Sequence, residues 1–225
     1  METRIKIIGS SHISKESVKE VQEEFKNFNP QIIAVELDST RIKSLFEKKQ
    51  EKQNFSEIRK AYGIKGASII TFLSYIQRKL GKIVKTDPGS EMREAVTIAK
   101  KNNLQLELID QPIEITLHHL SKAIKFRVIM RMIKDVITAP FKRHPQIKID
   151  LNKVPDDATI DLMISEVKKQ YPEIHKALID DRNRYMAKNL FKLYKDNPDK
   201  KILVVVGAGH KKEMIQLLKK YEIEN

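Results

Sequence analysis

KILVVVG, residues 201–207, is the most continuous apolar strand pattern in the chain, and it leads directly into Ala208, Gly209 and His210. A short run of aliphatic, mostly β-branched residues that ends at glycine predicts a strand buried on both faces. Three further strand patterns precede it, namely RIKII (4–8), QIIAVEL (31–37) and LQLELID (104–110). Helical patterns separate the four, and this alternation predicts an α/β fold with a mostly parallel central sheet and helices on both faces.

The longest helical pattern lies between the third and the fourth strand, from Pro112 to about Tyr194. A connection of this length exceeds an ordinary crossover between neighbouring strands. We therefore expect a single domain over residues 1–225, in which residues 111–200 form a helical insertion. This insertion is expected either to cap the site as a lid or to form the interface of a homodimer.

The composition excludes several kinds of site. The chain has 225 residues and no cysteine, so disulfides, thiolate zinc sites and a cysteine nucleophile are all excluded, and any metal must be bound by His, Asp or Glu. No signal-peptide pattern follows Met1, and the longest uncharged stretch, residues 66–77, is shorter than the roughly 20 residues that a membrane-spanning helix needs. We expect a soluble, cytoplasmic protein.

The net charge of +13 raises the question of a nucleic-acid or anionic-membrane partner. The lysines are dispersed along helical patterns next to glutamates, and the chain lacks tryptophan, which argues against nucleic-acid binding. Residues 124–137 interleave apolar and basic residues, a pattern that suits either a peripheral membrane contact or a packed helix with snorkelling cations. We favour the packed helix.

Polar residues lie at or just past the carboxyl end of each predicted strand: His12, Glu36, Asp110 and His210. Because the carboxyl ends of parallel strands meet at one edge of a sheet, we expect these four side chains to converge there. Glu36 matters most, since it ends an otherwise apolar strand. A carboxylate at such a place needs a partner, because burying it alone costs several kcal/mol.

His12 and His210 each stand three residues after a glycine that ends a strand. Two imidazoles and a carboxylate are a common donor set for zinc, manganese or cobalt, so His12, Glu36 and His210 are predicted metal ligands. The alternative is that both histidines cap helix starts and that Glu36 merely precedes the next helix. One Gly-x-x-His is a weak signal, but two at matching strand ends, with a carboxylate on a third, favour the site.

Three charged residues are further candidates. Glu91 is either an ordinary acid in the first turn of a helix or a second carboxylate that serves as ligand or base. Arg182 is predicted to bind a substrate carboxylate or an oxyanion, and the alternative is an ion pair with Asp180 or Asp181. Arg41, five residues after Glu36, either reaches the same site or lies on the surface.

Six ordered blocks resemble the TraB family: GSSHIS, IIAVELDSTR, PGSEMREA, LIDQPIEITL, DDRNRYMAKNL and VVVGAGH. The family's bacterial member PrgY is associated with shutdown of peptide pheromone activity, and its wider clan includes Tiki metalloproteases, erythromycin esterases and haem-binding ChaN proteins. The resemblance implies the fold of that clan and a metal-dependent hydrolase or peptidase activity. It maps the metal or catalytic groups onto His12, Glu36 and His210.

The same resemblance places Asp181, Arg182 and Asn183 near the site and carries Asp110 over as a secondary candidate. The predicted function is metal-assisted hydrolysis of a small peptide or an exposed peptide terminus, with Glu36 as third ligand or as base. The alternative is a protein that sequesters a peptide or haem without turnover. A nucleic-acid or membrane-surface protein is the third possibility.

Overall fold

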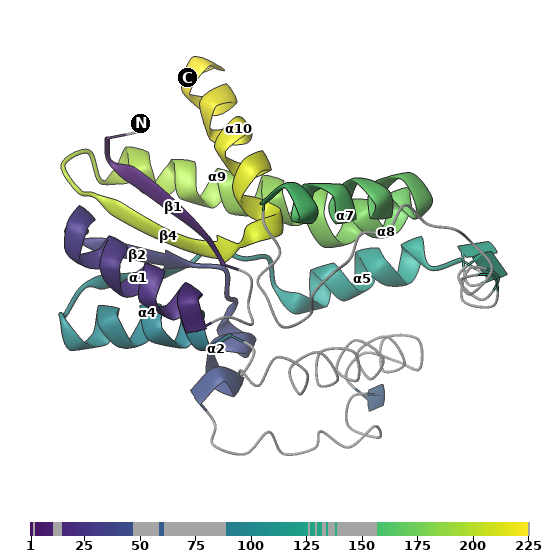
Figure 1. Cartoon of the computed structure of the whole chain (residues 1–225), viewed down its shortest axis with the longest axis horizontal. Helices are drawn as coiled ribbons and strands as arrows, with labels where there is room; N and C mark the ends of the chain where they lie inside the picture. Colours follow the sequence, from purple (N-terminus) through teal and green to yellow (C-terminus); the bar gives the residue numbers. More distant parts are fainter. Residues whose placement is uncertain are drawn as a thin grey trace.

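A computed structural model describes residues 1, 3–10, 15–46, 59–60, 89–125, 127–128, 130–131, 134, 138 and 157–224. Four strands within these residues form one sheet: β1 (Ile5–Ser10), β2 (Ile32–Val35), β3 (Gln105–Leu108) and β4 (Ile202–Gly207). All neighbouring strands are parallel, in the order β1-β4-β2-β3 (Figure 1). The predicted α/β class and the parallel sheet are confirmed.

The strand β4 is buried along its whole length, as its apolar sequence predicts. Its side chains alternate between the two faces of the sheet, so that Leu203 and Val205 belong to one core cluster and Ile202, Val204 and Val206 to the other. A strand between two others and covered on both faces has no position for a polar side chain. This explains why ILVVVG is the least interrupted apolar run.

Helices cover both faces of the sheet, which also confirms the prediction. The helices α1 (Lys15–Phe28) and α4 (Ser90–Lys101) pack on one face, and α9 (Asp181–Asp196) and α10 (Ala208–Glu224) pack on the other (Figure 1). Val21 of α1 and Val96 of α4 are fully buried against the first face. Met186 of α9 and Met214 of α10 are fully buried against the second.

The strand ends differ from the sequence-based ranges. The second strand ends at Val35 rather than residue 37, because the Glu36 N–H still bonds Val205 O (3.0 Å) whereas the Leu37 N–H turns back to Val35 O (2.8 Å). The first strand continues past residue 8 through Gly9 and Ser10, which pair with Val206 and Gly207 of β4. Glycine therefore does not end β1. The chain needs it there for another reason.

Gly9 lies where the start of α10 passes over β1. A Cβ atom at Gly9 would come within 2.9 Å of Lys211 Cδ and 3.2 Å of Ala208 Cα. The second of these is a backbone atom and cannot move aside on its own. Close approach of two backbones, rather than a turn, therefore explains this glycine.

The described part of residues 111–200 is helical. After β3 it contains α5 (Ile113–Ala123), α7 (Asp157–Gln170), α8 (Pro172–His175) and the π-helical turn η2 (Lys176–Asp180), which continues into α9. In Figure 1, α5, α7 and α8 extend sideways from the end of the sheet, whereas α9 returns across its face. That residues 111–200 form an insertion within one domain stays a prediction.

Membrane contact was considered for a spanning helix and for residues 124–137. No described helix is both long enough and apolar enough to cross a bilayer. Residues 124–137 are described only in part: Val128 is buried, Met130 is about half exposed, and the Arg131 guanidinium donates to Gln170 O at 2.8 Å. One cation of this segment therefore contacts the end of α7.

Candidate active site

The carboxyl ends of β1, β2 and β4 lie side by side. The register pairs Ser10 with Gly207 across β1 and β4, and Val35 with Val205 across β2 and β4. Glu36 follows β2 directly, and α10 starts immediately after β4. The polar residues at these ends therefore start from one edge of the sheet, as the sequence predicts.

Glu36 is 6% exposed and has partners on both carboxylate oxygens. Its Oε2 accepts a hydrogen bond of 2.6 Å from the Gly207 N–H at the end of β4. Its Oε1 forms an ion pair with Arg182 Nη2 and lies 3.3 Å from His210 Nε2. The buried carboxylate is thus stabilised by a backbone donor and a guanidinium.

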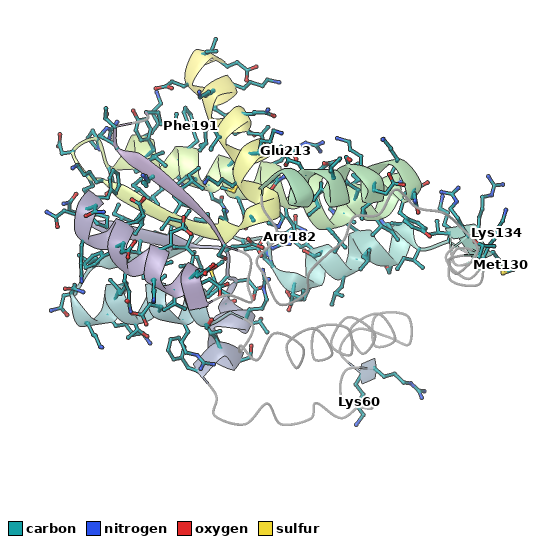
Figure 2. The ribbon with its side chains drawn as sticks, in the orientation of Figure 1. Lys60, Met130, Lys134, Arg182, Phe191 and Glu213 are labelled. Carbon is teal, nitrogen blue, oxygen red and sulfur yellow. The ribbon has the colours of Figure 1, made fainter. Side chains whose placement is uncertain are left out.

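Arg182 lies in the first turn of α9 and contacts three other side chains of the cluster. Its Nε and Nη2 donate to the two oxygens of Asp110 at 3.1 and 2.7 Å, a bidentate pair, and Nη2 also faces Glu36. Its Nη1 lies 3.2 Å from His210 Nε2. The ion-pair alternative was predicted with the wrong partners, because the carboxylates that Arg182 binds are Glu36 and Asp110. Figure 2 labels Arg182 near the strand ends.

Arg41 brings α2 (Ser39–Phe46) to the same cluster. Its guanidinium forms ion pairs with Asp110 and, at 3.0 Å through Nε, with Asp38. Asp38 also accepts the Thr40 and Arg41 N–H groups at 2.7 and 2.9 Å, so it caps the start of α2. Burial lowers the pKa of Arg41 from its ordinary value, and the positive charge of Arg182 lowers that pKa further.

His210 is 5% exposed and lies in the first turn of α10. Its Nδ1 is 2.6 Å from the side-chain oxygen of Asn183, which is fully buried on α9. The other ring nitrogen faces Glu36 and Arg182. The structure therefore brings Glu36, Arg182, Asn183 and His210 together.

Glu91 is fully buried in the first turn of α4. Ser10 Oγ donates to its Oε1 at 3.3 Å, and Ser10 is the β1 partner of Gly207. Because Gly207 donates to Glu36, the two carboxylates of Glu36 and Glu91 bind adjacent strand ends. Glu91 is therefore both an acid in the first turn of a helix and a buried carboxylate beside the site.

One predicted residue, Asp181, lies outside this cluster. Asp181 binds Lys176 Nζ (2.6 Å), His119 Nδ1 (3.1 Å) and Arg184 Nη1 (3.3 Å), all side chains that are more than a third exposed. Neighbouring residues on a helix point about 100° apart, so Asp181 and Arg182 face different surroundings. His12 lies outside the described residues.

Glu213 belongs to the cluster but is not among the residues predicted from the sequence. Glu213 on α10 accepts a 2.7 Å hydrogen bond from the side-chain nitrogen of Asn183. In the sequence Glu213 is one acid among the lysines of a polar helix face. Its spacing of three residues from His210, which places both on one side of a helix, is the signal that could have found it.

The buried side chains of the cluster offer some of the donors that a divalent cation requires. Glu36 and His210 meet at 3.3 Å, and His210 keeps its other nitrogen on a carbonyl oxygen, as metal-binding histidines commonly do. Four buried carboxylates (Glu36, Asp38, Glu91 and Asp110) outnumber the two guanidinium groups of the cluster. Within the described residues no three His, Asp or Glu side chains form a ligand group, and Arg182 contacts both predicted ligands. Glu36 and His210 therefore fit a cation as ligands. Arg182 would then share, or give up, its contacts with Glu36 Oε1 and His210 Nε2.

Comparison with known proteins gives a consistent result. Residues 2–224 match the family model described as TraB/PrgY/gumN family. An uncharacterised protein of Methanocaldococcus jannaschii is 34% identical over 227 residues, which cover 100% of this chain and 55% of that protein. The human TraB domain-containing protein is 22% identical over 199 residues, covering 82% of this chain and 51% of the human protein. The chain spans about half the length of these curated relatives.

Proposed function

This chain belongs to the TraB/PrgY/gumN family, and from this premise we propose that it is a metal-dependent hydrolase that acts on a small peptide or an exposed peptide terminus. The observation that carries the proposal is the convergence of Glu36, Arg182 and His210 at one sheet edge, each fixed by a second partner. Buried ionisable groups held this way are typical of catalytic sites.

We assign the roles by what each side chain contacts. Glu36 and His210 would hold a manganese, cobalt or zinc ion, with His12 as the third ligand on the strength of the sequence pattern. A bound divalent ion supplies a water of lowered pKa and polarises a carbonyl oxygen. The excess of buried carboxylates over guanidinium groups supports a bound cation, because it leaves the cluster formally negative.

The protein's own groups would do the remaining work. Arg182 is a rigid donor fork beside both predicted ligands, so it can orient a substrate carboxylate or stabilise an oxyanion. Arg41 would hold Asp110 when Arg182 turns toward substrate, because the two guanidinium groups share that carboxylate. Glu91, buried beside Ser10, is the candidate for receiving a proton from the attacking water.

The test is metal analysis of the purified chain together with peptide-library digestion read by mass spectrometry. We expect retained manganese, cobalt or zinc and cleavage of some peptides, and loss of both in His12→Ala, His210→Ala and Glu36→Gln. His118→Ala is the matched control, because His118 is exposed and lies outside the cluster. Binding of none of the three metals, together with peptide or haem binding without turnover, would establish the sequestering alternative.

A further inference from the structure

A buried amide joins the two helices that flank the site. Asn183 of α9 contacts His210 Nδ1 through its oxygen at 2.6 Å and donates through its nitrogen to Glu213 Oε2 at 2.7 Å. Both partners of this amide, His210 and Glu213, belong to α10 and lie one helical turn apart. Figure 2 labels Glu213 on α10 and Arg182 on α9. Asn183 is fully buried and His210 nearly so, which makes each contact costly to leave unsatisfied.

The direction of this bridge follows from the chemistry of Glu213. A side-chain amide can be placed either way round, and only its partners decide which end is the oxygen. An ionised carboxylate accepts hydrogen bonds and donates none, so the Asn183 NH₂ group must face Glu213. The amide oxygen then faces His210 Nδ1, which must carry a proton to bond it.

The opposite side of the imidazole gives the same answer. Arg182 Nη1 lies 3.2 Å from His210 Nε2 and can only donate, so a hydrogen bond between these two atoms needs a lone pair on Nε2. In this tautomer Nε2 and Glu36 Oε1 are two acceptors 3.3 Å apart. Arg182 accommodates them because Nη1 serves the imidazole while Nη2 serves the carboxylate.

We propose that Glu213 is a positioning residue that orients the Asn183 amide and thereby keeps the proton of His210 on Nδ1, leaving Nε2 bare toward Glu36 and Arg182. Use of that lone pair as a ligand or base rests on the proposed function. The tautomer itself does not, since it follows from four side chains and their hydrogen bonds. Without a carboxylate at position 213, the amide can rotate and donate to Nδ1, which stabilises the Nε2–H form.

The experiment is a nitrogen-15 spectrum of the histidine rings in the full chain at neutral pH, which separates the two neutral tautomers by their ring shifts. The chain has six histidines, and His210→Gln identifies the His210 signals by their loss. We expect the Nδ1–H form to dominate in the unsubstituted protein. Glu213→Gln keeps the shape of the side chain but removes the obligate acceptor, and Glu213→Ala removes the group. Both are expected to raise the Nε2–H fraction severalfold.

Glu222→Gln is the matched control, because it makes the same charge change on the same helix at a residue that binds the terminal amine of Met1. It should leave the His210 spectrum unchanged. A dominant Nε2–H form in the unsubstituted protein would overturn the proposal, and so would identical His210 spectra in all Glu213 variants. In the latter case Glu213 would be only a tie between α9 and α10.

A second measurement separates this inference from the proposed function. Titration with Co²⁺ or Zn²⁺ is expected to show affinity about 10-fold lower in Glu213→Gln than in the Glu222→Gln control, the usual size of an effect on a ligand's outer partner. If the unsubstituted protein binds no metal, the metal-dependent function fails while the tautomer result stands. If metal affinity is unchanged although the tautomer shifts, Glu213 positions the ring without serving a metal.

Discussion

Arg182 and Glu36 lie 146 residues apart in the sequence and meet as an ion pair whose side chains are only 12% and 6% exposed. The pair joins the first turn of α9 to the end of β2, across the edge of the sheet. The same guanidinium also binds Asp110, so one side chain is ion-paired with two buried carboxylates. The stability of the fold and the geometry of the candidate site therefore depend on the same residue.

Removing this guanidinium should be costly. Arg182→Ala leaves Glu36 and Asp110 buried beside one another, and breaking a buried pair from one side costs about 3–5 kcal/mol of unfolding free energy. Arg184→Ala removes an arginine from the same helix whose side chain is 55% exposed, and it should cost about 0–1 kcal/mol. Urea denaturation at neutral pH measures both. Equal losses in the two variants would contradict the assignment of Arg182 as the buried cation of the site.

The two aspartates predicted from the sequence should behave differently. Asp110→Asn leaves two guanidinium groups near one neutral amide. We therefore expect the unfolding free energy to fall by about 3 kcal/mol or more, and any hydrolytic activity to be lost. Asp181→Asn affects only exposed ion pairs and should change the unfolding free energy by less than about 1 kcal/mol. Peptide digestion and urea denaturation test both variants. If Asp181→Asn abolishes activity without unfolding the chain, Asp181 acts in catalysis from outside the cluster.

The cap of α2 also fixes an arginine. Asp38→Ala removes an acceptor for two N–H groups, which costs about 1 kcal/mol, and it also frees Arg41 on one side. Asp38→Ser restores a capping oxygen but no charge. Comparison of the two variants by thermal unfolding separates the cap from the ion pair. We expect Asp38→Ser to recover only part of the loss, and full recovery would show that the contact with Arg41 adds nothing.

Gly9 and Gly209, two glycines near the site, make a matched pair. Gly9→Ala forces a Cβ against Ala208 Cα at 3.2 Å, which is backbone, whereas at Gly209 the nearest atom is the tip of the Ile164 side chain at 2.9 Å. Overpacking against backbone typically costs about 1–3 kcal/mol. Alanine within a helix such as α10 gains up to about 1 kcal/mol over glycine, which offsets part of the strain at Gly209. Urea midpoints should therefore fall further for Gly9→Ala, and the reverse order would contradict the close approach of β1 and α10.

The sequence predicts the strands because their burial imposes a simple pattern. An apolar run such as residues 202–207 has few alternatives in a chain of this composition. The pattern does not give the strand ends, because Glu36 stays in the ladder through its backbone while its side chain already belongs to the site. The pattern does not give the order of the strands either, because strands pair through backbone groups that are the same in every residue.

The candidate site was predictable in part. Strand ends identify Glu36, Asp110 and His210, because buried polar residues at one sheet edge need a reason. The partners of these residues were harder to predict. Arg182 follows two aspartates with which it could form a local ion pair, and only the orientation of α9 on the sheet shows that its side chain reaches Glu36 instead. Glu213 was missed because an acid on a lysine-rich helix is indistinguishable from a solvated one until the neighbouring helix is in place.

The position of β4 has a consequence for how the chain folds. Among the four described strands β4 comes last in the sequence, yet it is hydrogen-bonded to β1 on one side and to β2 on the other. During synthesis, β1 and β2 leave the ribosome long before β4 is made. Their apolar residues therefore stay without the strand that pairs with both of them. Pairing of such distant segments makes folding slow, because the long loop is closed before the contacts form. We therefore expect the nascent chain to depend on chaperones until β4 has been synthesised and released from the ribosome.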